Sequence, residues 1–323
     1  MAEENQTTHK RRVRYSGKYP KKFEEKYKEL QPEKYKDTIE HVIKKGNTPA
    51  GMHISIMVNE ILDFLKIQPG ETGFDATLGY GGHTKAMLQC LNGQGHIYAT
   101  DVDPEESART RKRLEEAGFG EDILTIRLQN FCTIDEIAKE AGGFDFILAD
   151  LGVSSMQIDN PKRGFSFKVD GPLDLRLNQE AGISAAERLA AITKDELAGM
   201  LYENSDEPYC EELAKAITDE IRKGNRIDTT TKLRNIIEKT LDFLPEKEKK
   251  DTIKKTCQRT FQALRIDVNR EFEVLYEFME KLPDALKPGG RAAILTFHSG
   301  EDKLVKKLSL IHISEPTRLQ LIS

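Results

Sequence analysis

The sequence lacks any long apolar run. No hydrophobic stretch approaches the roughly 18 residues that a membrane-spanning helix needs, and the Lys/Arg-rich start is not followed by the apolar region of a secretory signal. These absences predict a cytoplasmic protein that does not enter a membrane. The 323 residues, of which 32% are charged and 38% hydrophobic, are typical of a globular protein of about two domains rather than of a disordered or fibrous chain.

Cysteine is scarce as well. Cys90, Cys132, Cys210 and Cys257 lie far apart, and none belongs to a Cys-x-x-Cys pair or to a Cys/His group at zinc-finger spacing. The sequence therefore predicts neither a disulfide framework nor a metal site, and we expect free, mostly buried thiols.

Outside the start of the chain, basic residues are fewer than acidic ones. Residues 1–45 contain 13 Lys/Arg and 8 Asp/Glu, a balance of +5, so the net charge of −5 leaves about −10 for residues 46–323. Between Lys10 and Lys22 the cations alternate with tyrosines, as in segments that contact a phosphate backbone. We interpret residues 1–48 as a basic arm that either contacts RNA or is simply solvated. The acidic remainder indicates that any RNA contacts are localised.

From Gly70 onward, short apolar runs alternate with helical patterns, which is typical of a parallel sheet covered by helices. We expect strands at 72–76, 95–101, 123–128, 144–151 and 291–298, and helices at 83–91 and from Pro104. Roughly 140 residues separate the fourth and fifth strands, far more than one crossover connection needs. The fold class is therefore α/β, with a second domain inserted between these two strands.

The inserted segment has helical patterns. Ser184 and Glu187, and again Thr193 and Glu196, have the spacing of a capping box, in which a hydroxyl and an acid satisfy the free N–H groups at a helix start. Apolar residues then recur at every third or fourth position. The insertion is therefore expected to be all-helical.

The helical pattern continues up to the fifth strand. Apolar residues from Phe261 to Met279 recur at spacings of three and four, which predicts one long helix that leads back into the main domain. We expect an inserted domain at 173–256 and a main domain formed by 49–172 and 257–308.

Glycines cluster where the first strand meets its helix, in the segment 75–83. Gly81 and Gly82 would let a ligand approach the backbone at a helix N-terminus. The dinucleotide pattern needs a third glycine where Thr84 stands, which disfavours a nicotinamide ligand. Asp101 ends the second strand 19 residues after Gly82, close to the offset at which an acid binds ribose hydroxyls. A nucleotide-like ligand without a bound pyrophosphate is predicted, and the alternative is a tight turn and a helix cap.

Asp150 ends the fourth strand and is expected in the same crevice, because ligands of open α/β sheets bind beyond the carboxyl ends of the strands. The surrounding residues belong to seven blocks that occur in order: DATLGYGGHT, DVDP, LADLGVSSMQID, RGFSF, GPLDLRL, RTFQALRIDVN and PGGRAAILTFHSGED. Together these blocks resemble the bacterial 16S ribosomal RNA cytosine-N4 methyltransferases over roughly residues 50–307.

The resemblance implies a class I methyltransferase fold, a Rossmann-like sheet, with an inserted helical domain for substrate recognition. It implies S-adenosyl-L-methionine as cofactor and, as partner, 16S ribosomal RNA in the small ribosomal subunit, where the N4 amino group of a decoding-region cytidine would be methylated. No metal is expected, because the methyl group on a sulfonium is already a good electrophile and catalysis can come mainly from alignment.

The resemblance also assigns site residues. It places cofactor contacts at Gly81, Gly82, His83, Asp101, Phe131, Asp150 and Gln157. Phe131 could equally belong to the core. Asp150 is the candidate catalytic acceptor for the amino group, although it could serve the cofactor alone.

Substrate contacts are expected from a second group of residues. They are Ser154, Ser155, Arg163, Phe165 and His298, because an unstacked base needs cationic and aromatic neighbours. The alternatives are core packing for Phe165, a surface ion pair for Arg163 and a structural hydrogen bond for His298. We expect His298 at the end of the fifth strand.

Some positions depart from the family pattern. Tyr80 stands where glycine is usual, residues 203–207 replace a glycine-glutamate pair, and Gly300 stands where leucine is usual. These departures indicate a divergent branch whose target could be shifted. Residues 309–323 look like a translated adapter, so we expect a non-native tail and the absence of the last strands of the sheet.

The sequence is also compatible with two other functions. One is a methyltransferase of the same fold that acts on another RNA or DNA base. The other is a non-catalytic RNA-binding factor of ribosome assembly that keeps the cofactor pocket as a relic.

Overall fold

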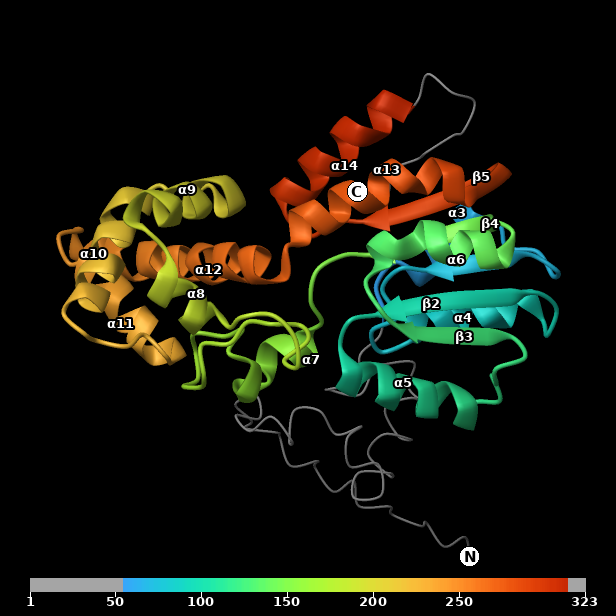
Figure 1. The fold of residues 1–323 in the computed structure, drawn as a ribbon, viewed down its shortest axis with the longest axis horizontal. Coiled ribbons are helices and arrows are strands. Elements are labelled where there is room, and N and C mark those ends of the chain that lie inside the picture. The colour runs from blue at the N-terminus through green and yellow to red at the C-terminus, as the bar shows by residue number, and fades with distance from the viewer. Residues whose placement is uncertain (1–54, 313–323) are drawn as a thin grey trace, which may run out of the picture. The chain divides into compact units, whose positions relative to one another are not determined.

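The computed structural model of the chain describes residues 55–312, with side chains through residue 309. Five strands form one parallel sheet in the order β3-β2-β1-β4-β5 (Figure 1). They are β1 (Thr72–Asp75), β2 (His96–Asp101), β3 (Leu124–Leu128), β4 (Phe144–Asp150) and β5 (Leu286–Leu295). The chain runs outward from β1 to β3 and returns to the other side of β1, which confirms the expected α/β class. The first four strands agree with their expected bounds to within one residue.

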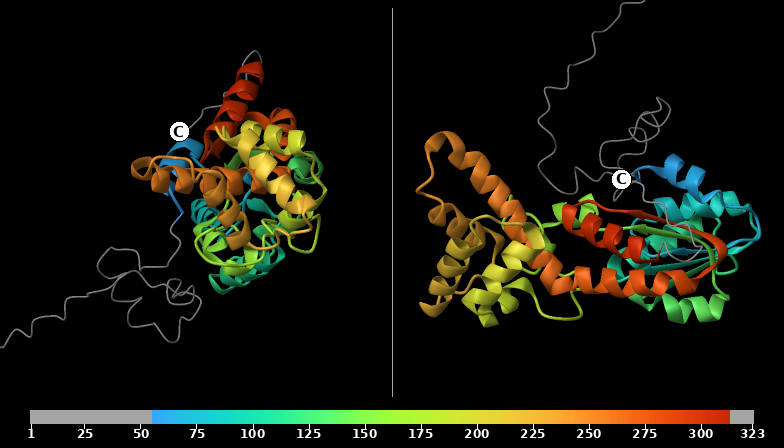
Figure 2. Two further views of the ribbon diagram at one scale, coloured as in Figure 1. Left: turned by 90° about the vertical axis from the view of Figure 1, so that its left-hand side faces the viewer. Right: turned by 90° about the horizontal axis from the view of Figure 1, so that it is seen from above.

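Helices cover both faces of the sheet. One layer consists of α3 (Val58–Leu65), α4 (Gly82–Leu91) and α5 (Pro104–Glu116), and the other of α6 (Ile134–Ala141), α13 (Glu271–Ala285) and α14 (Ser299–His312). Strand β4 contributes side chains to the apolar cores on both faces of the sheet. Phe146 and Leu148 are buried against the first layer, and Ile147 and Ala149 against the second. This alternation follows from the period of two along a strand. The result is a three-layer domain, seen from two further sides in Figure 2.

The fifth strand differs from its expected bounds. β5 begins at Leu286, which pairs with Phe144 before an irregularity in the ladder, and regular pairing resumes at Arg291. A Pro-Gly-Gly segment occupies the irregular stretch, so the alternating pattern of the sequence starts late. β5 ends at Leu295, and His298 therefore lies outside the strand, directly before α14.

Helices α8 to α12 build a second apolar core. They are α8 (Ala185–Ala191), α9 (Lys194–Ser205), α10 (Cys210–Arg222), α11 (Thr230–Thr240) and α12 (Glu246–Asn269), and α8 to α11 gather around α12 in Figure 1. Capping boxes begin α8 at Ser184 and α9 at Thr193, as the sequence predicts. The expected helical insertion is thus present between β4 and β5.

Two expectations about the end of the insertion are wrong. The boundary expected between 256 and 257 falls inside α12, where Phe261 still packs in the core of the insertion. The residues up to Met279 do not form one helix, because α12 ends at Asn269 and α13 begins after Arg270, which has a left-handed φ of 52°. The apolar spacing continues across this break because the side chains before it face the insertion and those after it face the sheet.

Some expectations lie outside the described residues. These are the basic arm at 1–48 and the part of the tail beyond residue 312. Ser309, the first residue of the expected tail, is buried in α14. Among the described strands, β5 pairs only with β4 and is one edge of the sheet. In the described part of the chain, no helix has the length and apolar content to cross a membrane.

Candidate functional site

A cavity of about 270 Å³ opens at the carboxyl ends of β1, β2 and β4. Its walls include Gly81 from the turn after β1, the strand-end residues Asp101 and Asp150, Phe131 from the segment after β3, and Glu271 from α13. The cavity straddles β1 and β4, between which the chain changes its direction of progress across the sheet. Ligands of open α/β sheets bind at such a switch point, so the cavity is the candidate ligand site.

The glycine turn after β1 is closely packed against its surroundings. Gly81, the N-cap of α4, has φ +80°, and a Cβ there would lie 2.6 Å from Thr110 Cγ2. A Cβ at Gly82 would lie 2.2 Å from Ser55 Oγ. Position 81 therefore favours glycine through both its positive φ and its close contact, whereas a side chain at position 82 would require Ser55 to move. The turn brings the first N–H groups of α4, which have no partners within the helix, to the cavity wall.

Asp75 fastens this turn to the sheet. One carboxylate oxygen accepts from Thr84 Oγ1 at 2.6 Å and the other from Thr77 N at 3.0 Å. Burial raises the pKa of Asp75, and the hydrogen bonds from Thr84 and Thr77 oppose this shift. Thr77 in turn accepts a hydrogen bond from Asp150 N at 2.7 Å. The glycine turn and the end of β4 are therefore held in one fixed arrangement.

Asp101 occupies the position expected of a ribose-binding acid. Its Oδ2 accepts from Gly79 N at 2.8 Å and its Oδ1 from Asp103 N at 2.9 Å. Burial raises the pKa of Asp101 to about 6. Each carboxylate oxygen has two lone pairs, so each can accept a further hydrogen bond from a ligand in the cavity.

His83 and Asp150 form a pair at the base of the cavity. His83 Nε2 lies 2.8 Å from Ile56 O, and because a carbonyl only accepts, this nitrogen carries a proton. His83 Nδ1 then faces Asp150 Oδ2 at 3.5 Å, a contact that is favourable only when one of the two atoms is protonated. Burial raises the pKa of Asp150 to about 6, and Asp75 and Glu301 add to this shift while His83 opposes it. Asp150 Oδ1 is buried without a hydrogen-bond partner among the described residues.

The remaining expected cofactor contacts also border the cavity, in different ways. Phe131, in the short helix η2 (Phe131–Thr133), packs edge-to-face on Phe278 with ring centroids 5.1 Å apart and still lines the cavity. Gln157 donates to Asp103 Oδ2 at 3.0 Å and accepts from Ser154 N at 2.9 Å. Its side chain therefore positions α7 (Ser155–Asp159), which begins with a capping box.

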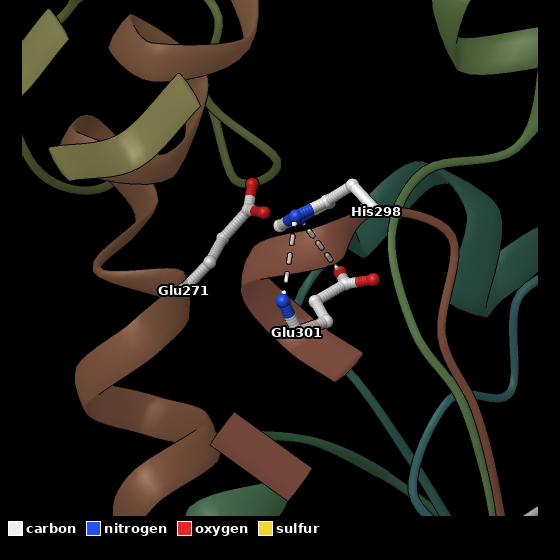
Figure 3. Close-up of side chains that lie close together, drawn as sticks. All are labelled: Glu271, His298 and Glu301. Carbon is white, nitrogen blue, oxygen red and sulfur yellow. Dashed lines mark hydrogen bonds and ion pairs between the residues drawn. The ribbon is translucent and has the colours of Figure 1, made fainter. Parts of the chain in front are cut away.

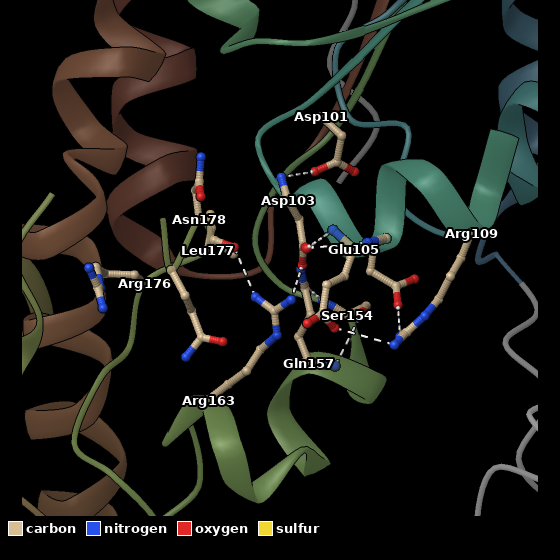
Figure 4. A network of polar contacts seen from close by, with 12 residues as sticks. Asp101, Asp103, Glu105, Arg109, Ser154, Gln157, Arg163, Arg176, Leu177 and Asn178 are labelled. Carbon is tan, nitrogen blue, oxygen red and sulfur yellow. Dashed lines mark hydrogen bonds and ion pairs between the residues drawn. The ribbon is translucent and has the colours of Figure 1, made fainter. Parts of the chain in front are cut away.

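The expected substrate residues do not all reach the site. Ser154 and Ser155 line the cavity. Arg163, at the end of η3 (Pro161–Arg163), is buried and lies 2.6 Å from Asp103 Oδ2, as Figure 4 shows. Phe165 is 8% exposed and packs in the core of the insertion. The expected base contacts by Arg163 and Phe165 are thus corrected to a buried ion pair and core packing, because a sequence motif does not reveal which way its side chains turn.

His298 does not line the cavity either. Its Nε2 lies 3.2 Å from Glu301 Oε1, and its Nδ1 accepts from Glu301 N at 3.4 Å. Figure 3 shows this contact together with Glu271 of α13. The three side chains offer ligand atoms within 4.8 Å of one another, as a cation site would. Glu271, however, makes two hydrogen bonds with Arg265, at 2.8 and 2.9 Å, and Glu301 accepts from Phe297 N at 2.8 Å. Protein partners thus account for the arrangement.

Three residues of the site were not identified from the sequence. Asp75 and Glu301 organise the site from buried positions, and Phe297 lies on the cavity wall. The position of Asp75 at the end of the first strand is a sequence signal that could have identified it. Glu301 and Phe297 flank His298, but only the fold turns them toward the cavity.

Tyr80 shows how the glycine turn accommodates an unusual residue. The Arg113 guanidinium lies 3.8 Å from the centroid of the Tyr80 ring, and Arg113 also donates to Tyr80 O at 3.3 Å. Arg113 of helix α5 therefore stabilises the glycine turn, and Tyr80 also lines the cavity.

Comparison with known proteins gives a consistent result. The model of the MraW methylase family matches residues 50–322, a range that includes most of the segment expected to be a non-native tail. The chain is 87% identical over 307 residues to the ribosomal RNA small subunit methyltransferase H 1 of Agathobacter rectalis, covering 95% of this chain and 87% of that protein. It is 70% identical over 305 residues to the protein of the same name in Lachnoclostridium phytofermentans, covering 94% and 83% of the two chains.

Proposed function

This chain belongs to the MraW methylase family, and on that premise we propose that it transfers a methyl group from S-adenosylmethionine to the N4 amino group of a cytidine in the decoding region of 16S ribosomal RNA. The names of the relatives support methylation of small-subunit ribosomal RNA. The observation that carries the choice of an amino group is Asp150, whose buried Oδ1 at the cavity lacks a donor among the described residues.

The cavity fits the proposed cofactor. The N-terminus of α4 and the glycine turn suit close approach of a ligand to the backbone, and Asp101 keeps free lone pairs for two ribose hydroxyls. Phe131 offers an aromatic wall for an adenine ring. S-adenosylmethionine supplies a methyl group on a positively charged sulfur, which is electrophilic without the help of a metal.

Asp150 is proposed to activate the nucleophile. The lone pair of cytosine N4 is delocalised into the ring, and a hydrogen bond from the amino group to Asp150 Oδ1 favours the pyramidal nitrogen that can attack. Bound S-adenosylmethionine would supply the methyl carbon for the new bond to N4, its sulfur would keep the electron pair of the broken carbon–sulfur bond, and one N4 proton would leave. Asp150 accepts this proton. His83, whose Nδ1 lies 3.5 Å from Asp150 Oδ2, stabilises the charge of the Asp150 carboxylate.

The proposed reaction also suggests a substrate particle and roles for the other parts of the chain. We propose the small ribosomal subunit as the substrate particle, which places the protein in the cytoplasm. The helical insertion is proposed to recognise the RNA, because Leu177 and Asn269 at its base line the cavity together with the cofactor turns. The basic arm at 1–48 is proposed as an additional RNA contact.

The deciding experiment is a methylation assay on small subunits isolated from cells that lack this activity. The protein and S-adenosylmethionine are added, and the modified nucleosides are identified by mass spectrometry. The proposal expects N4-methylcytidine at one decoding-region position. A different methylated nucleoside would show that the proposed substrate base is wrong. Cofactor binding without any methylation would favour a non-catalytic assembly factor. The Asp150→Asn variant, with cofactor binding measured separately, tests the assigned role of Asp150.

A further inference from the structure

Phe297 is exposed at the mouth of the cavity. Its side chain is 57% exposed, although it is a large apolar group two residues after the end of β5. The other exposed aromatic side chains of the described residues, Tyr202, Phe243 and Tyr276, do not border the cavity, whereas Phe297 does. A single exposed phenyl ring is ordinary on a protein surface, but one at the entrance of a ligand site is a candidate contact.

The ring lies beside the segment that follows Asp150. A Cβ built at Gly152 would lie 3.7 Å from Phe297 Cδ2, so the backbone two residues after the candidate acceptor borders the phenyl ring. Gly152 has φ +88°, a conformation that favours glycine and leaves this side of the ring without a side chain from position 152. The edge of the Phe297 ring and the segment that follows Asp150 therefore lie next to each other on the cavity wall.

A hydrogen bond to a buried carboxylate fixes the backbone of Phe297. Its N–H donates to Glu301 Oε2 at 2.8 Å, and Glu301 is only 3% exposed. His298 contacts the other oxygen of the same carboxylate at 3.2 Å (Figure 3). Burial acts to raise the pKa of Glu301, but His298 and the Phe297 N–H hold it below its usual value. An ionised, buried carboxylate thus anchors an exposed ring, which is the arrangement expected of a preorganised contact surface.

We propose that Phe297 is the stacking surface for the target base, which lies against the phenyl ring while its amino group donates to Asp150. This inference rests on the proposed function and adds the residue that positions the base. Aromatic side chains stack on any unpaired base through its π-face, so Phe297 contributes affinity and alignment while the choice of base falls to polar groups such as Asp150. Glu301 and His298 are positioning residues, since they act through the backbone of Phe297.

The test is a series of substitutions at Phe297, assayed with small subunits as methyl acceptor. Phe297→Leu removes the aromatic face and should lower kcat/KM about 5- to 150-fold, the range that corresponds to one lost base–aromatic stack. Phe297→Tyr and Phe297→Trp retain a face and should stay within about threefold of the wild type. Affinity for S-adenosylmethionine, measured by calorimetry, should be unchanged in all three variants.

Tyr276→Leu is the matched control. Tyr276 is also an exposed aromatic residue, at 44%, but it lies in α13 of the sheet domain and does not border the cavity. Its substitution should leave kcat/KM unchanged. Because Phe297 is mostly exposed, its variants should fold, and thermal melting checks this directly.

The outcomes separate this inference from the proposed function. If the wild type forms N4-methylcytidine and Phe297→Leu is equally active, the stacking role is wrong while the function stands. If Leu, Tyr and Trp variants are equally impaired, aromatic stacking is also wrong. If the wild type methylates a different nucleoside but still depends on an aromatic residue at 297, the stacking role stands and the proposed substrate fails.

Discussion

Arg163 Nη2 lies 2.6 Å from Asp103 Oδ2, with both side chains almost entirely buried. The same oxygen accepts from Gln157, and the other oxygen of Asp103 caps α5 through the N–H groups of Glu105 and Glu106. One carboxylate therefore connects the turn after β2 with α7 and η3 (Figure 4). Because Asp101 and α7 both border the cavity, this ion pair ties together two of its walls.

Loss of the arginine should destabilise the protein strongly. Arg163→Met leaves the Asp103 charge buried without its cation, which costs about 3–5 kcal/mol in comparable buried pairs. The free energy of unfolding in urea measures the effect. Arg222→Met removes an exposed partner of Asp219 and should cost less than about 1 kcal/mol. Similar losses in the two variants would contradict a structural role for the buried pair.

The reaction rate should depend on the ionisation of Asp150. Its pKa is raised to about 6, and the proposed mechanism needs the ionised form, so kcat/KM should be constant above this pH and fall about tenfold per pH unit below it. Asp150→Asn should lower the rate by about 10²- to 10⁴-fold and remove this pH dependence. Initial rates between pH 5 and about 8 provide the measurement. An unchanged profile in the variant would assign the titration to another group.

The same group should affect stability with a defined sign. A carboxyl group whose pKa is raised on folding binds its proton more tightly in the folded state. The contribution of Asp150 to stability is therefore greatest below pH 3.8 and is lost as the pH rises toward 6. Relative to Asp150→Asn, the wild type should gain stability as the pH falls through this window. Urea unfolding of both proteins at several pH values tests the sign, and parallel curves would contradict it.

Asp101 should be required for binding of S-adenosylmethionine. In Asp101→Asn only one oxygen remains, so either Gly79 N or Asp103 N loses its acceptor, at a cost of about 1–3 kcal/mol. Calorimetry should show weaker binding by about tenfold or more, since a ribose contact is lost as well. The exposed Asp284→Asn is the control and should bind as the wild type does. Equal affinities in all three proteins would exclude Asp101 from the cofactor site.

Two glycine substitutions separate backbone strain from steric overlap. Gly81→Ala and Gly93→Ala both place a side chain at positive φ, which costs about 1–2 kcal/mol. Only at Gly81 does the added Cβ meet another residue, Thr110, at 2.6 Å, while nothing lies within 4 Å at Gly93. Gly81→Ala should therefore lose about 1–3 kcal/mol more stability and also weaken cofactor binding. Equal losses in the two variants would show that the glycine turn tolerates the overlap.

Much of the site could be predicted because its signals are local. The glycine turn and the acids Asp101 and Asp150 stand at the ends of strands with clear apolar patterns, and parallel strands bring their carboxyl ends to one edge. Phe165 and Arg163 were misplaced because composition cannot tell an aromatic residue that contacts a base from one that fills a core. The break at Arg270 was missed because apolar spacing continues through it although the partner surface changes.

The sequence by itself determined the class of fold, the helical insertion and the edge of the sheet that carries the site, since these depend on the period of apolar residues and on residues adjacent in the chain. Only the tertiary structure decided which polar groups pair and which face the cavity. Asp103 meets Arg163 across 60 residues, and Glu301 meets the backbone that presents Phe297 beside Gly152. Such contacts depend on the packing of segments distant in sequence, where burial fixes which partner each side chain finds.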